Sequence, residues 1–261
     1  MLKKLSLDLR SRALPLLNNI EAAKTLFFAF LLLWLISSRS FWSAVFYLAG
    51  SLYLYFSASS DREIEGNSKK LLASFLIIVI APFFWAPHIS GSFFNFFYLF
   101  FYLLIWSAFF FIVLGIKNNI FKNSRLIYGA LNNFLLFFLL IFLFSIDRSQ
   151  FFLVKYVSFF TITFLLIREF LILEFEKLKR AKLNLFAAIF SILIFQFAWG
   201  SMFLPIGFLN SAALMLVIVL MIKDSIIAYF RKILDRQLIM KNITIILIFG
   251  LIIFVASRWQ P

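Results

Sequence analysis

The sequence predicts an all-α, polytopic transmembrane helix bundle of about nine spans, with the N-terminus in the cytoplasm and the C-terminus outside. The first observation is composition: 64% of the residues are hydrophobic, whereas a soluble domain is about 45–50% apolar. The second is that apolar runs such as 93–116 continue without alternation, unlike the strands of a membrane barrel. The third is that basic residues gather in every second loop. Because lipid offers the backbone no hydrogen-bond partners, these runs are expected to be helices.

The chain begins with a segment that is expected to lie on the cytoplasmic membrane surface, residues 1–24. Leu and Ile recur there at helical spacing, and the nearby Lys and Arg residues fall off that stripe. This pattern is typical of an interfacial amphipathic helix. A single transmembrane domain, 25–257, and a short outer tail, 258–261, are expected to follow.

Nine apolar segments make up the expected transmembrane domain. One helix over 25–57 would be about 50 Å long, too long for a hydrocarbon core of about 30 Å. The tripeptide Ser38-Arg39-Ser40 is therefore expected to divide this stretch into two short spans. The nine spans are expected at 25–37, 41–57, 71–86, 93–116, 126–146, 151–173, 183–204, 209–222 and 243–257.

The basic residues predict the orientation of the chain. With these nine spans, all but four of the 25 Lys and Arg residues fall on the side of the N-terminus; the other four are Arg39, Arg148, Lys155 and Arg258. Short basic loops stay in the cytoplasm, so the pattern predicts a multi-pass protein of the cell's inner (plasma) membrane, in contact with the lipid bilayer. It also accounts for the formal net charge of +14, and no nucleic-acid partner is expected.

The chain offers few residues for catalysis or for holding a cofactor. It has no cysteine, which excludes disulfides and thiolate metal ligands. It also lacks a Gly-rich phosphate loop, a Gly-x-Ser-x-Gly elbow and a His-Glu-x-x-His motif. Its one histidine, His88, has no carboxylate near it in the sequence, so it is expected at a solvated turn rather than in a metal site. No catalytic residue, cofactor or metal ligand is therefore assigned.

Polar side chains within apolar spans are candidates for a binding site, because they are costly in lipid. Gln196 is the only glutamine inside an apolar run. Either it lines an outward-facing cavity, with Trp199 on the same helix face, or it hydrogen-bonds to a neighbouring helix. Lys155 extends to the lipid headgroups, pairs with Asp147 or contacts an anionic substrate. The candidate cavity is therefore lined by Gln196, Trp199, Lys155 and His88.

Three further polar residues are interpreted as helix contacts. Asn132 and Asn133 are adjacent, so they point about 100° apart on a helix and are not expected to share one partner. Lys223 follows the span 209–222, where it extends to the membrane surface or pairs with a neighbouring helix. Acidic residues are nearly absent from the spans, which argues against a carrier driven by protons or sodium.

The late hairpin and the basic return after it carry a resemblance. The residues concerned are Gln196, Trp199, Leu204, Pro205, Arg231 and Lys232. In this pattern the chain resembles an uncharacterised family of multi-span inner-membrane proteins from candidate-phylum bacteria. The resemblance implies a helical membrane fold and no known activity.

Three functions remain open from the sequence. The first, which we prefer, is the binding or transport of a lipid or another hydrophobic molecule through the candidate cavity. The second is a membrane scaffold or assembly subunit that acts on a membrane-protein partner through its helix faces and basic loops. The third is an enzyme acting on a lipid-linked substrate, which ranks last because the chain shows no convergent set of catalytic groups.

Overall fold

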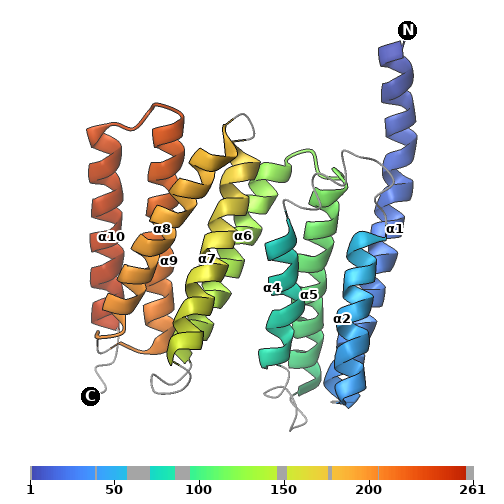
Figure 1. The fold of residues 1–261 in the computed structure, drawn as a ribbon, viewed down its shortest axis with the longest axis horizontal. Coiled ribbons are helices and arrows are strands. Elements are labelled where there is room, and N and C mark those ends of the chain that lie inside the picture. Colours follow the sequence, from blue (N-terminus) through green and yellow to red (C-terminus); the bar gives the residue numbers. More distant parts are fainter. Residues whose placement is uncertain are drawn as a thin grey trace. The chain divides into compact units, whose positions relative to one another are not determined.

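The computed structural model contains only helices in the residues that it describes, which are 2–38, 40–57, 71–85, 95–145, 152–175, 178–204 and 206–256. The helices in these ranges, labelled in Figure 1, are α1 (Leu2–Ser38), α2 (Phe41–Phe56), α4 (Leu72–Trp85), α5 (Asn95–Lys117), α6 (Ser124–Ser145), α7 (Phe152–Glu174), α8 (Arg180–Ser201), α9 (Phe208–Phe230) and α10 (Arg236–Ala256).

Most of these helices are long enough to cross a bilayer. Among the described residues, seven helices have the length and apolar composition of membrane spans; they are α5 to α10 and the Asn19–Ser38 part of α1. The other two, Phe41–Phe56 and Leu72–Phe83, are apolar but shorter. The predicted all-α class is confirmed, and the chain is a multi-pass helical membrane protein.

The first two predicted segments belong to one helix. We expected a surface segment over 1–24 and a short span over 25–37, and the single helix Leu2–Ser38 runs through both without a break. Glu21 and Lys24 lie within this helix, where their side chains form an ion pair of 3.0 Å. Because the two charges are paired within the helix, they do not interrupt it.

The two last helices also differ from the expected spans. α9 continues past Ile222 to Phe230, and α10 begins at Arg236 rather than at 243. The prediction ended the earlier span before Lys223 and assigned 223–241 to a basic, amphipathic segment on the cytoplasmic side. In the structure Lys223 is buried, so it interrupts neither the helix nor the packing.

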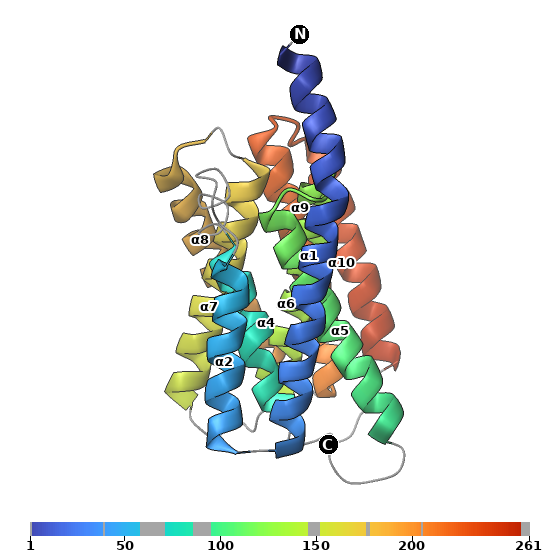
Figure 2. The same cartoon turned by 90° about the vertical axis from the view of Figure 1, so that its right-hand side faces the viewer.

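The described chain forms two compact units, and we describe each by itself. Unit 1 is Met1–Leu131 and unit 2 is Asn132–Pro261. In unit 1, α1 packs against α2 and α5, and α4 packs against α5; α1 and α2 lie side by side in the turned view as well (Figure 2). The Phe28 ring stacks on that of Phe110 with ring centres 4.1 Å apart, and Tyr55 stacks on Phe75 at the same distance. These buried aromatic rings form the core of unit 1.

Unit 2 is built from the remainder of α6 and the last four helices. In it α7 packs against α8, α8 against α9, and α9 against α10. The Tyr156 hydroxyl donates to the Met202 sulfur at 2.8 Å, which joins α7 to the end of α8. Buried residues of small or moderate size, such as Ala187, Ala198, Ala212 and Met215, let these helices approach closely.

Candidate functional site

The structure describes three of the four residues of the predicted cavity, on the neighbouring helices α7 and α8. Trp199 is 52% exposed, and Gln196 is exposed on the same helix, α8. Gln196 forms no hydrogen bond with any other residue that the structure describes. Lys155 lies on α7 and is buried, with its Nζ 5.8 Å from the centre of the Tyr156 ring. His88 lies outside the described residues. Two polar clusters, whose members the sequence did not bring together, are better defined.

The first cluster lies in unit 2 and consists of Lys223, Asn132 and Asn133; we call it the amide–lysine cluster. Lys223 is 5% exposed. Its Nζ donates hydrogen bonds to the side-chain oxygen of Asn132 at 2.8 Å and to that of Asn133 at 2.5 Å. A lysine ammonium carries three N–H groups, so two of them are used by neutral amides. The cluster joins α9 to α6.

A third helix closes the cluster on one side. Asn132 donates from its Nδ2 to the backbone oxygen of Leu166 on α7, at 3.0 Å. The Phe170 ring, one turn further along α7, lies with its centre 4.0 Å from the Lys223 Nζ, which is a cation–π distance. Three helices of unit 2 therefore meet at one ammonium group.

Our expectation that Asn132 and Asn133 would not share a partner is wrong. Both side-chain oxygens accept from the same Nζ. The reason is the length of the lysine side chain, which places the ammonium between two amides that leave the α6 helix about 100° apart. The sequence did not identify this partner, because it placed Lys223 outside the span 209–222, in a basic amphipathic segment.

The charge of Lys223 is not balanced by a carboxylate within the described part of the chain. No ion pair joins it to a described acidic residue. Its neighbour Asp224 instead accepts from Asn242 Nδ2 on α10, at 3.4 Å, and Asn242 also donates to the Ser225 hydroxyl at 3.1 Å. Asp224 is thus used in joining α9 to α10.

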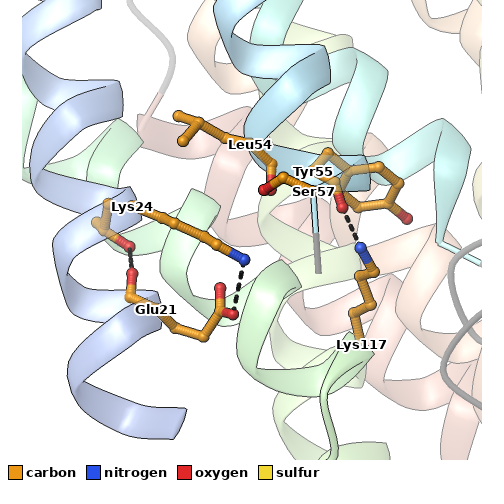
Figure 3. Close-up of polar contacts among 7 residues, drawn as sticks. Glu21, Lys24, Leu54, Tyr55, Ser57 and Lys117 are labelled. Atoms are coloured by element: carbon orange, nitrogen blue, oxygen red, sulfur yellow. Dashed lines mark hydrogen bonds and ion pairs between the residues drawn. The ribbon is translucent and has the colours of Figure 1, made fainter. Parts of the chain in front are cut away.

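The second cluster lies in unit 1, where Lys117 ends α5 (Figure 3). Lys117 is fully buried and its Nζ donates to the backbone oxygen of Tyr55, in the last turn of α2. The ammonium also lies 4.6 Å from the centre of the Tyr55 ring. The last carbonyl groups of a helix carry a partial negative charge and lack partners within the helix. Lys117 therefore supplies both a donor and a compensating charge to the end of α2.

Other polar groups of unit 1 lie on the neighbouring helices. The Glu21 carboxylate accepts from Lys24 Nζ at 3.0 Å, and the Thr25 hydroxyl donates to the Glu21 backbone oxygen at 2.8 Å. Asn118 is buried, and neither of its amide atoms has a hydrogen-bond partner among the described residues. The cluster thus contains an acid as well as two lysines (Figure 3).

No group of three or more His, Asp or Glu side chains gathers among the described residues. A scan against family models and searches of curated proteins and of solved structures found no match. The long apolar helices define a multi-pass helical membrane protein, and any finer assignment depends on the residues of this chain.

Proposed function

We propose that this chain is a multi-pass protein of the plasma (bacterial inner) membrane that binds or transports a lipid or another hydrophobic molecule. The placement in that membrane, with the N-terminus in the cytoplasm, is supported by the distribution of its basic residues, of which all but four of 25 fall on one side of the nine apolar segments.

The observation that carries the proposal is the amide–lysine cluster. A cation and amide groups inside an apolar helix bundle are costly and are commonly functional in membrane proteins. Here Lys223 and Asn132 are buried where α6, α7 and α9 meet. The three helices have the length and the mostly apolar composition of membrane spans, which suits a ligand that is itself mostly apolar.

Mass spectrometry of the small molecules that co-purify with the chain in mild detergent tests the proposal. The matched control is an unrelated multi-pass protein purified from the same membranes. We expect one class of lipid or hydrophobic molecule to be enriched several-fold on this chain relative to the control. Identical profiles that match the bulk membrane would contradict the proposed function.

A second candidate, a scaffold or assembly subunit, is favoured by the exposed face of α8. Gln196 and Trp199 lie on it and Phe203 lies in the turn that follows, all three exposed. A glutamine on an exposed helix face can hydrogen-bond to the helix of another protein. A protein that co-purifies with the native chain and is lost from Gln196→Leu would support this function, and its retention by the variant would count against it.

A further inference from the structure

We infer that the amide–lysine cluster binds the anionic group, a phosphate or a carboxylate, of an amphiphilic ligand. This inference rests on the proposed function and specifies its ligand: a molecule with an apolar body and a negatively charged end. Two independent features of the cluster lead to it, namely the balance of charge around Lys223 and the direction of the unused donors.

The first feature is an ammonium whose described acceptors are all neutral. Lys223 Nζ contacts two amide oxygens and the face of the Phe170 ring, and no described carboxylate pairs with it. Neutral acceptors satisfy the hydrogen-bonding of a cation but leave its charge unbalanced in a medium of low dielectric constant. An anion beside the cluster would supply the missing charge.

The second feature is the orientation of the asparagine amides. Because both Oδ1 atoms face the ammonium, both Nδ2 atoms face away from it. Asn132 uses its Nδ2 to donate to the Leu166 oxygen, whereas the Asn133 Nδ2 donates to no described residue. Asn133 is also the more exposed of the two. The accessible side of the cluster therefore presents N–H donors, which an acceptor such as a phosphate or carboxylate oxygen would use.

The position of the cluster along its helices favours an amphiphile over a small soluble anion. Lys223 lies about two turns, or roughly 10 Å, before the end of α9 at Phe230. Beyond that end come Arg231 and Lys232, and basic residues at a membrane surface attract anionic lipids. A ligand anchored at Lys223 would thus have its charged end near the basic end of α9 and its apolar part along the helices.

Lys117 provides a matched control within the same chain. It too is a buried lysine at a cation–π distance from an aromatic ring. Its ammonium, however, is directed at the end of α2 through the Tyr55 oxygen, where the helix itself supplies negative charge. Replacing Lys117 removes a buried cation without touching the donors that we assign to the ligand.

The experiment uses the full chain in mild detergent and measures binding from the rise in thermal stability and from native mass spectra. The probes are phosphatidylglycerol, phosphatidylcholine with the same acyl chains, and inorganic phosphate. We compare the native chain with Lys223→Met, Asn133→Leu and the control Lys117→Met. We expect phosphatidylglycerol to bind the native chain and the control alike, and about tenfold more weakly to Lys223→Met, the loss expected for one charge-assisted hydrogen bond.

Asn133→Leu is a second test in case Lys223→Met does not fold. It removes the Asn133 Nδ2 donor that we assign to the ligand and keeps the lysine. It should weaken phosphatidylglycerol binding several-fold and leave phosphatidylcholine binding unchanged. If inorganic phosphate alone stabilises the native chain and displaces phosphatidylglycerol, the anion site stands and its ligand is a soluble anion rather than a lipid.

Two negative results are distinguishable. Equal phosphatidylglycerol affinity in the native chain, Lys223→Met and Asn133→Leu would overturn the anion site, while a specific hydrophobic molecule retained by all three would leave the proposed function intact. A native chain that retains only bulk lipid and prefers none of the probes would overturn the proposed function and the anion site together.

Discussion

Unit 1 and unit 2 each bury a lysine against an aromatic ring, and they differ in what lies opposite the ammonium. Lys117 faces the carbonyl end of α2, on a unit that also buries the Glu21 carboxylate. Lys223 faces two side-chain amides. Both ammonium groups have hydrogen-bond acceptors, but only the first has a partial negative charge provided by the fold.

The difference separates a structural lysine from a binding one. A cation that caps a helix completes the fold, and nothing need be added to it. A cation held by neutral amides is satisfied in hydrogen bonding and unbalanced in charge. Replacing each lysine or one of its partners should therefore affect the two units in different ways. Four predictions follow, from the largest effect to the smallest; the first two concern the lysines, and the last two concern the packing and an ion pair near them.

Asn132→Leu should have the largest effect. It takes one acceptor from the Lys223 ammonium and one donor from the Leu166 oxygen, and it leaves a buried charge less well satisfied. We expect a loss of about 2–3 kcal/mol, measured by thermal unfolding in detergent. Adding Lys223→Met should restore part of the loss, because the charge is then gone. If the free energy of unfolding lost by the double variant equalled the sum of the losses in the two single variants, the two residues would not interact.

Lys117→Met should be the more damaging of the two lysine replacements. It removes the donor to the Tyr55 oxygen at the end of α2, and we expect a cost of about 1–2 kcal/mol. Lys223→Met should cost less than about 1 kcal/mol in the absence of ligand, since the loss of the donor to the Asn132 and Asn133 oxygens is offset by the removal of a buried cation whose charge no partner balances. A lower melting temperature for Lys223→Met than for Lys117→Met would contradict the distinction between a structural lysine in unit 1 and a binding lysine in unit 2.

Gly115→Ala tests how tightly the turn after Lys117 is packed. A Cβ at Gly115 would lie 2.3 Å from the ring edge of Phe121, so the ring would have to move. We expect a loss of about 1 kcal/mol, or roughly 2–4 °C in melting temperature. The control is Gly200→Ala on α8, where a Cβ would meet nothing within 4 Å. Equal melting temperatures for the two variants would show that the Phe121 ring moves aside at little cost in stability.

Arg231→Ala should have the smallest effect. Its guanidinium forms an ion pair of 2.5 Å with Glu174, but the arginine side chain is 55% exposed. Exposed pairs are weak because water and salt screen them, so we expect a change below about 0.5 kcal/mol, measured in the same unfolding assay. A larger loss would mean that the pair holds α7 to the end of α9.

The sequence predicted the fold class and the order of the helices because long apolar runs in lipid have few alternatives. It did not predict the amide–lysine cluster. Asn132 and Lys223 are far apart in the chain, and their contact depends on how α6 and α9 pack, which hydropathy does not determine. One signal was available: the apolar residues Ile226, Ile227 and Ala228 after Lys223 indicate that the helix continues and that the lysine lies inside it.

The most direct test of the account is a density map of the chain in nanodiscs made from the lipids of its own membrane. The account predicts density for a ligand's charged group within hydrogen-bond distance of the Asn133 Nδ2 and on the same side of α6 as the Lys223 ammonium. It predicts no such density at Lys117, where the end of α2 is the partner. A map in which both lysines lack a ligand, or in which a carboxylate of the chain itself pairs with Lys223, would contradict it.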